Sequence, residues 1–494
     1  MYEEHLTKKS IFFSWQTLLL LCLFFLIRLG SFLLKDHLII QGILVFLLLM
    51  LLGILYFKKP EYAWYLVLGE LFLGGGGHFL EISGLSIRTI FICFFLFLWL
   101  MQHLGQNTLK EKLLTKTPLI YFLSIFFVFL IFSVFNGLEN GHSLRLIFQD
   151  LIPYSLLFLI FPSNHLFSEE KTQNYFVRLL FVFIIGNALF SLITFALFSS
   201  GLNTIHDIFY TWYRDVNIGK ITDLYNGFFR IVEPEHLLIT PLILLITSLL
   251  MRDERHHKMW RVIRFFALTI FCLNFSRTYF LALGAGLIIL KYKHSFIKWL
   301  RECFTVVILL SLIFISVNFI ASGGNSLGLE LVGLRAQSLI NPEIELSSNT
   351  RMLILPVINT LILIHPIIGS GLGATVTFFD NNIFNTVTTS NFDWGYLEMW
   401  AELGIFGALL LVALYLFVAA ILIMKIKTIP DWHDFDVGLL AGIVAFLVMN
   451  ITMPALFHVY GILFLLLVLT LALKNTTVYE QTTKTLYKVF NRLK

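Results

Sequence analysis

The chain has 494 residues, of which 58% are hydrophobic and only 13% are charged. Soluble domains carry roughly 25% charged residues, so this composition excludes a water-exposed globular protein and indicates a surface covered largely by lipid. The net charge of +5 is modest, and its basic residues lie in short loops rather than on one face, which argues against a nucleic-acid-binding protein. The four cysteines lie in or beside apolar runs without a C-x-x-C pair, so we expect no disulfide framework, metal site or cofactor.

The apolar runs predict about fourteen transmembrane helices, because one span needs about 20 apolar residues. In chain order the predicted spans are 11–34, 38–57, 61–77, 87–104, 118–136, 144–161, 175–198, 236–251, 260–274, 278–292, 302–321, 399–424, 437–453 and 455–473. The expected fold class is therefore all-α: a polytopic transmembrane helix bundle that forms a single membrane domain over residues 1–494.

Lysine and arginine predict the orientation of this bundle. With the N-terminus in the cytoplasm, 25 of the 35 Lys and Arg residues fall in cytoplasmic segments, as the positive-inside rule requires. A single miscounted span would destroy this agreement. We therefore expect both termini in the cytoplasm, with the basic loops 252–264 and 291–301 on the same side.

Two apolar runs do not fit a simple span. The run 265–290 is too long for one helix and has basic loops on both sides, so we expect two short helices, or a re-entrant pair, with Arg277 at the outer turn. Two prolines and a histidine interrupt 352–368, which favours an interfacial helix. Two unusually long external segments remain, 199–235 and 322–398, and we expect the long external chain to fold over the outer face.

Ionisable residues at membrane depth are costly and usually functional. The outward half of the predicted bundle contains Arg88, Arg145, Asp150, Arg230, Glu233, Glu235, Arg277, Arg351, His365 and Asp393. Arginine suits a diphosphate because its planar fork pairs with phosphate oxygens and keeps its charge when desolvated. These arginines predict a phosphorylated lipid head group as ligand, and salt bridges between helices or snorkelling are the alternative.

Two outward carboxylates flank Pro234, where the first long external segment re-enters the membrane. Glu233 and Glu235 follow Arg230 by three and five residues. A saccharide site needs carboxylates to bind hydroxyl groups or to act as a general base. An ion pair with Arg230 is the other interpretation.

Two longer segments resemble the signatures of the O-antigen ligase and polymerase family. Arg351–Gly373 reads RMLILPVINTLILIHPIIGSGLG, an arginine before a helix that ends in His-Pro and a glycine-rich turn. Asp393–Gly407 reads DWGYLEMWAELGIFG, with a polar pair, Tyr-Leu and Glu-x-Gly before a membrane helix. The turn Ser276-Arg277-Thr278 and the element Gly84–Arg88 resemble two further family elements, so the resemblance spans residues 80–410.

One position departs from the family pattern. Ligases of the family typically have a histidine where this chain has Asp393, and Trp394 replaces the usual asparagine. Polymerases vary more at these positions and are compatible with an acidic residue. The departure therefore favours a polymerase, with O-antigen ligase as the alternative within the family.

The resemblance implies a glycosyltransferase of the bacterial inner membrane whose active face is external, or periplasmic. Its expected partners are a polyprenyl-diphosphate-linked glycan donor, a glycan acceptor, the lipid bilayer and a chain-length regulator. Arginine can stabilise the leaving diphosphate without a metal, so we expect metal-independent transfer.

The candidate site residues form two groups. For the donor diphosphate and the turn beside it they are Arg277, Arg351, Arg88, His365 and Gly371. For the catalytic base or acceptor-orienting group they are Asp393, Glu233 and Glu235.

Two hypotheses of another class stay open. A lipid-linked oligosaccharide flippase also combines many helices with buried charges. Such transporters often contain two related halves, which this sequence does not display, and the charges here lie toward one face rather than at mid-membrane. A non-catalytic assembly partner is the third possibility.

Overall fold

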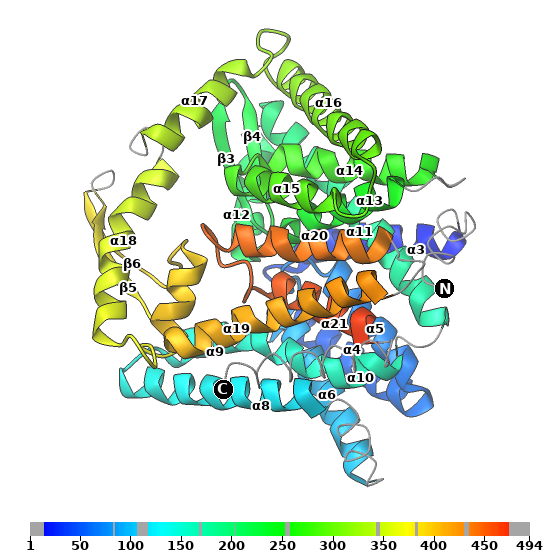
Figure 1. The fold of residues 1–494 in the computed structure, drawn as a ribbon, viewed down its shortest axis with the longest axis vertical. Coiled ribbons are helices and arrows are strands. Elements are labelled where there is room, and N and C mark those ends of the chain that lie inside the picture. The colour runs from blue at the N-terminus through cyan, green and yellow to red at the C-terminus, as the bar shows by residue number, and fades with distance from the viewer. Residues whose placement is uncertain are drawn as a thin grey trace.

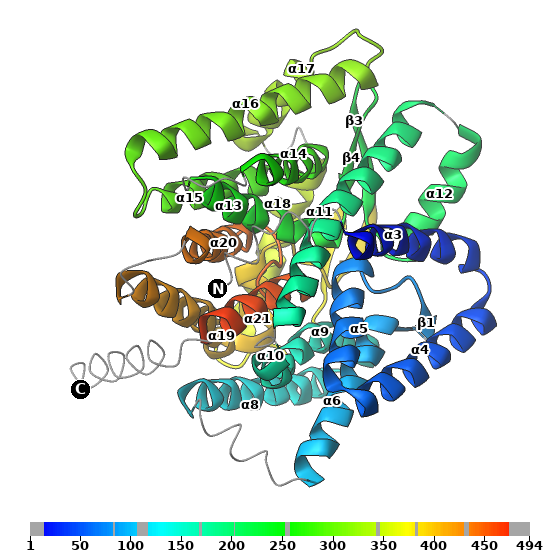
Figure 2. The same cartoon turned by 90° about the vertical axis from the view of Figure 1, so that its right-hand side faces the viewer.

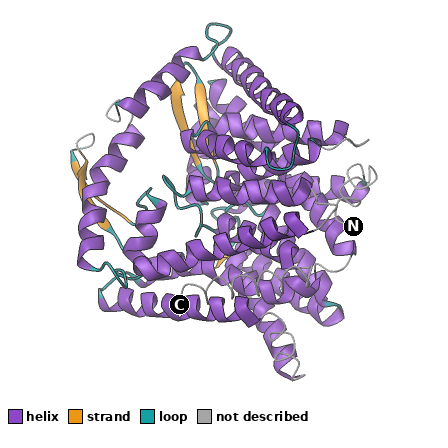
Figure 3. Ribbon diagram, viewed as in Figure 1, coloured by secondary structure: helices purple, strands orange, loops and turns teal. Residues whose placement is uncertain are grey.

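The computed structural model of this chain describes residues 14–82, 84–105, 117–166, 170–201, 203–251, 257–341, 346–380, 384–428 and 434–473. Both predicted cytoplasmic tails lie largely outside these ranges. The described residues are mostly helical, as the composition predicts, and many of the helices run side by side across the view of Figure 1. Figure 3 shows how little strand accompanies them.

The predicted spans coincide with helices throughout the described chain. The first seven correspond to α3 (Trp15–Leu34), α4 (Leu38–Lys58), α5 (Pro60–Leu73), α6 (Ile87–Gly105), α8 (Thr117–Glu139), the run α9 (Leu144–Ser155), η1 (Leu156–Leu159) and α10 (Ile160–Leu166), and α11 (Glu170–Ser199). The others correspond to η2 (Pro234–Leu238) with α13 (Ile239–Leu250), α14 (His257–Asn274), α15 (Arg277–Leu290), α16 (Phe296–Ala321), α19 (Gly395–Thr428), α20 (Asp434–Met449) and α21 (Val459–Leu473).

Length and composition make this a polytopic helical membrane protein. Within the described ranges, eight helices are long and apolar enough to cross a bilayer, whereas α15 and α21 are among the shorter apolar ones. Large apolar side chains such as Ile39, Phe132 and Phe135 are exposed on the outer helices, which suits lipid contact. The centre of the bundle is packed protein, because α13 is buried along almost its whole length.

The break predicted within the run 265–290 is confirmed. Helices α14 and α15 are separated only by Phe275 and Ser276, and Arg277 is the first residue of α15. Phe275 has a φ of +43°, in the left-handed region that non-glycine residues seldom adopt. The chain therefore reverses abruptly, with an arginine at the reversal.

The two long segments predicted to be external contain structure that an all-α expectation does not include. The first folds into α12 (Asn203–Asp215) and an antiparallel hairpin of β3 (Lys220–Tyr225) and β4 (Phe228–Val232). The second folds into α17 (Leu329–Ile340), α18 (Leu346–Ile364) and a hairpin of β5 (Val376–Asp380) and β6 (Asn385–Thr389). A short pair, β1 (Glu81–Ile82) and β2 (Leu85–Ser86), precedes α6.

Helix α18, predicted as interfacial, lies with β5 and β6 beyond one end of the bundle helices, in yellow at the left of Figure 1 and behind the bundle in Figure 2. It has a small core of its own. Ile354, Ile358 and Ile362 recur along one face of α18 and pack with Val376 and Phe378 of β5. This core holds the segment in a fixed position against the start of α19.

Candidate functional site

Arg277 connects α15 to the second long segment between the predicted spans. Its two terminal guanidinium nitrogens donate hydrogen bonds to Ser338 Oγ and Ser348 Oγ, each at 2.6 Å. Ser338 belongs to α17 and Ser348 to α18. One arginine at the start of α15 therefore contacts both α17 and α18.

A pocket of about 450 Å³ opens beside Arg277, between α14, α15, α16 and α17. Its wall is mostly apolar, and the lining residues include Phe275, Phe280, Leu281, Leu310, Phe314 and Val332. Arg335 of α17 is a second cation in this wall and lies over the Phe275 ring, 5.9 Å from the ring centroid. Leu281 is 64% exposed, so the pocket borders the lipid-facing surface. Apolar walls with two arginines suit an amphiphile with an anionic head group.

Arg351 and Asp393 lie close together although they are remote in sequence. The Nε atom of Arg351 is 3.6 Å from Oδ2 of Asp393, and the side chains are 23% and 44% exposed. The neighbouring Trp394 donates from its indole nitrogen to the carbonyl oxygen of Arg351 at 3.1 Å. Because Ser348 lies one helical turn before Arg351, the bond from Arg277 to Ser348 brings both arginines to the same end of α18.

The first turns of α19 carry two carboxylates that the sequence analysis did not select. Glu398 is buried and accepts a hydrogen bond from the backbone N–H of Phe392 at 3.2 Å. Glu402 is also buried and is hydrogen-bonded to Asp150 of α9. Both lie within the quoted signature, but nothing in the sequence indicates that Asp150 would approach them.

The glycine-rich turn after α18 packs against protein backbone. Gly371 has a φ of +91°, and a Cβ atom there would lie 2.0 Å from the backbone nitrogen of Gly137 in α8. At Gly369 a Cβ would lie 2.3 Å from the carbonyl oxygen of Glu402. His365 is partly exposed at the end of α18, and its carbonyl oxygen accepts from Gly369 N–H at 3.0 Å. The turn therefore joins α8, α18 and α19 at the C-terminal end of α18, whereas Arg351 lies near the start of that helix.

Arg88 belongs to a different cluster, at the start of α6. Its Nε lies 3.0 Å from Oε2 of Glu70, and its guanidinium is 5.4 Å from the ring centroid of Tyr460 in α21. It also donates to the carbonyl oxygen of Gly75. Arg88 is buried, so its position indicates a structural role that links α5, α6 and α21 within the bundle.

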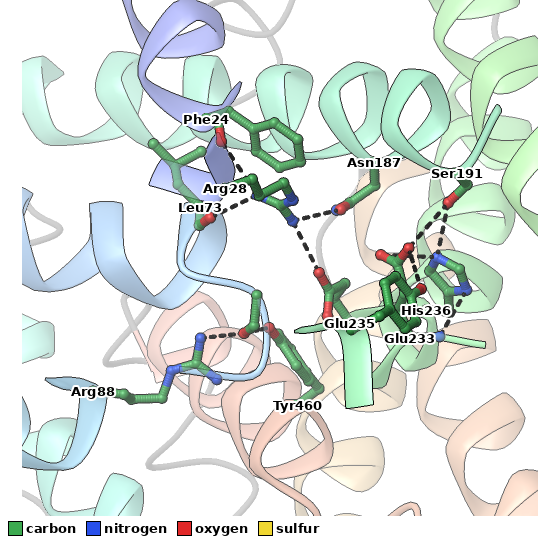
Figure 4. A network of polar contacts seen from close by, with 12 residues as sticks. Phe24, Arg28, Leu73, Arg88, Asn187, Ser191, Glu233, Glu235, His236 and Tyr460 are labelled. Atoms are coloured by element: carbon green, nitrogen blue, oxygen red, sulfur yellow. Dashed lines mark hydrogen bonds and ion pairs between the residues drawn. The ribbon is translucent and has the colours of Figure 1, made fainter. Parts of the chain in front are cut away.

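Glu235 forms a buried ion pair with Arg28 of α3. A terminal nitrogen of Arg28 lies 3.1 Å from Glu235 Oε1 and also donates to Asn187 Oδ1 at 3.1 Å (Figure 4). The other terminal nitrogen donates to the carbonyl oxygen of Leu73 at 3.0 Å. Arg28 was overlooked in the sequence analysis, although an arginine inside an apolar span is itself a signal for a buried partner.

Glu233 occupies a neighbouring polar cluster that is also closed to solvent. Its carboxylate accepts a hydrogen bond from the Tyr213 hydroxyl at 2.9 Å and lies 3.5 Å from Nε2 of His236. Glu233 is 1% exposed. Arg230, the alternative partner considered from the sequence, donates to the carbonyl oxygen of Asn274 at 2.7 Å. A carboxylate enclosed in this way is poorly placed to meet a saccharide hydroxyl.

The structure thus divides the expected site residues into separate clusters. Arg277, Arg351 and Asp393 gather at α18, with His365 and Gly371 following the same helix. Glu233 and Glu235 lie inside the bundle.

One comparison with known proteins finds a family match over part of the chain. Residues 262–412 match the family model described as O-antigen ligase, which confirms the resemblance inferred from the sequence. The matched range includes all of the expected site residues except Arg88, Glu233 and Glu235. No curated protein matches the chain significantly.

Proposed function

We propose, from the match of residues 262–412 to the family model described as O-antigen ligase, that the activity of this chain is glycan polymerisation. The match supports a membrane protein that transfers lipid-linked glycans. The proposed reaction joins polyprenyl-diphosphate-linked oligosaccharide repeat units into O-antigen or a related surface polysaccharide. We place the site on the external face of a bacterial inner membrane, with both termini in the cytoplasm.

The observation that carries this proposal is the meeting of two arginines and one accessible carboxylate at α18. Arg277 binds Ser348, Ser348 precedes Arg351 by one turn, and Arg351 lies 3.6 Å from Asp393. These groups have the two functions that the transfer requires: positive charge for a leaving diphosphate and a carboxylate for an incoming hydroxyl.

The proposed step is a substitution at the anomeric carbon of the donor sugar. A hydroxyl oxygen of the acceptor forms a new bond to that carbon while the bond to the diphosphate oxygen breaks. Asp393 accepts the hydroxyl proton, and the electron pair leaves with the polyprenyl diphosphate. Arg277 and Arg351 stabilise the negative charge on that leaving group, so the step needs no metal.

The apolar pocket supports a lipid-linked donor rather than a soluble one. It lies beside Arg277 and borders the lipid-facing surface at Leu281. A diphosphate at Arg277 would have the first isoprene units of its lipid within reach of this wall, and Arg335 adds a second positive charge there. Burial of an apolar chain stabilises binding by about 0.8 kcal/mol for each buried CH₂ group.

Accessibility favours Asp393 over the two glutamates as the base. Asp393 is 44% exposed and has an arginine beside it, whereas Glu233 and Glu235 are each 1% exposed. Both glutamates already have partners inside the bundle. We therefore propose Asp393 as the residue that orients or deprotonates the acceptor.

The O-antigen ligase description of the matched family model favours one second candidate, transfer of a finished lipid-linked glycan to a lipid A–core acceptor. Deletion of the gene separates the two reactions. Loss of polymer with a single repeat unit still attached to the acceptor supports the polymerase. Accumulation of lipid-linked polymer with nothing attached to the acceptor supports the ligase. Purified protein in vesicles that moves glycan lipids without forming glycosidic bonds would instead indicate a flippase.

A further inference from the structure

The turn that presents Arg277 needs support from outside itself. Only Phe275 and Ser276 separate α14 from α15, and Phe275 has a φ of +43°. A bulky residue in the left-handed region costs roughly 1–3 kcal/mol and persists only where its surroundings impose the conformation. Phe275 stacks on Phe314, with ring centroids 4.9 Å apart. This ring contact does not fix the backbone that precedes the turn, so other groups must do so.

Asn274, the last residue of α14, is held by two contacts. Its carbonyl oxygen accepts a hydrogen bond from Arg230 Nε at 2.7 Å. Its side-chain amide nitrogen lies 3.1 Å from Nδ1 of His236. Asn274 and His236 are both buried, so the amide and the imidazole meet without competition from bulk water.

The contacts around His236 identify which ring nitrogen carries the proton. The backbone N–H of Glu233 points at Nδ1 at 3.3 Å. A backbone amide can only donate, so Nδ1 is an acceptor and the Asn274 amide must donate to it as well. The proton therefore lies on Nε2, which faces Glu233 Oε2 at 3.5 Å and Ser191 Oγ at 3.4 Å (Figure 4). This arrangement requires a neutral imidazole with its acceptor directed at α14.

Glu233 is in turn oriented by the surrounding helices. The Tyr213 hydroxyl of α12 donates to Oε1 at 2.9 Å, and Ser191 of α11 lies 3.5 Å from the same oxygen. The polar contacts thus run from α11 and α12 through Glu233 and His236 to Asn274. They end at Asn274, three residues before Arg277.

We propose that His236 is a positioning residue for Arg277. Its Nδ1 atom holds the Asn274 amide, which sets the backbone of the turn and therefore the direction in which the Arg277 fork leaves α15. Glu233 acts by fixing the imidazole, rather than as a base. The inference rests on the proposed function, because it takes the donor diphosphate as the ligand of Arg277.

Two substitutions at His236 separate positioning from folding. His236→Asn keeps an acceptor at the position of Nδ1, because its amide oxygen is the same number of bonds from Cα. His236→Gln moves its amide one bond farther away and loses that acceptor. Asn274→Ala removes the donor from the other side. His294→Gln is the matched control: His294 also pairs with a carboxylate, lying 3.4 Å from Asp434, but at the opposite end of α15.

The measurement is the Kd of purified full-length protein for polyprenyl diphosphate, with thermal stability recorded in parallel. Misplacing a binding group by about 1 Å can cost up to about 10²-fold, so we expect His236→Gln and Asn274→Ala to raise the Kd about tenfold or more. His236→Asn and His294→Gln should stay within about twofold of the unmodified protein. Because His236 acts through Arg277, adding His236→Gln to Arg277→Lys should raise the Kd no further.

The outcomes distinguish this inference from the proposed function. If Arg277→Lys leaves the Kd unchanged, the diphosphate site itself is wrong. If Arg277→Lys raises the Kd but His236→Gln and Asn274→Ala do not, only the positioning role is overturned. If His236→Gln and Asn274→Ala lower the thermal stability but leave the Kd unchanged, His236 has only a structural role. Should His236→Gln fail to fold, Asn274→Ala decides the question.

Discussion

Replacing Arg277 with lysine tests the diphosphate site most directly. The guanidinium has five N–H groups in a fixed plane, and two of them serve Ser338 and Ser348. A planar guanidinium can present several donors to phosphate oxygens at once. Lysine presents three N–H groups on one nitrogen and cannot span both serines while also binding a phosphate. A hydrogen bond to a charged group contributes about 1.5–3 kcal/mol. Loss of one in the transition state lowers kcat/KM about 10- to 150-fold.

The assay is the initial rate of elongation by purified protein in vesicles, using a defined lipid-linked repeat unit. Polymer formed in cells is measured beside it, with the amount of protein in the membrane checked for each variant. Arg214→Lys, at an exposed position on α12, is the control and should keep the normal rate. Arg351→Lys should lose activity for the same reason as Arg277→Lys. Normal polymer from both Arg277→Lys and Arg351→Lys would refute the arginine site.

Other consequences can be checked independently. Asp393→Asn keeps the size of the side chain and removes its charge, so elongation should fall while the protein level stays normal. An active variant would mean that another carboxylate is the base. Elongation should survive a chelator, and recovery only on addition of magnesium or manganese would contradict the arginine mechanism. In a background without native cysteines, an impermeant thiol reagent should label Asn325→Cys from outside but not Lys293→Cys, and the opposite pattern would reverse the topology. Gly371→Ala should lower the free energy of unfolding by about 2 kcal/mol or more, because its Cβ would lie 2.0 Å from backbone of α8, whereas Gly333→Ala meets open space and should be tolerated.

The helices were predictable because the bilayer constrains them so strongly. A chain in hydrocarbon must satisfy its backbone hydrogen bonds internally, so each long apolar run could be assigned to a helix from composition alone. The length of the run 265–290 and the basic loops on both sides of it placed a break inside it, where α14 and α15 meet. The number of crossings and the side that each loop occupies stay predictions, because helix positions alone do not determine them.

The hairpins were missed although one of them had a readable signal. Asn226 and Gly227 are the pair favoured in two-residue type I′ turns, and their φ angles are +50° and +77°. They join β3 to β4, which pair with Ile221 opposite Ile231. Hydropathy over windows long enough for a membrane helix averages out such short strands, so the all-α prediction passed over them.

Local motifs were sufficient to select two residues that the structure places side by side, whereas residues outside any motif were passed over. Arg351 and Asp393 were selected from separate motifs, and they lie 3.6 Å apart. Arg335 escaped notice because a single arginine on α17 belongs to no motif, and its place beside Arg277 depends on tertiary packing. His236 was missed for the same reason, since its importance lies in a contact with Asn274, on another helix.

The two serines bound by Arg277 limit how this region can be exchanged or redesigned. Ser338 and Ser348 come from different helices but meet one guanidinium, so α17 and α18 share a common attachment to α15. A chimera that replaced only one of these helices would leave the other attached to a turn with a different geometry. Segments transferred between relatives should therefore run without interruption from the start of α15 to the start of α19, so that the arginine and both serines are inherited together.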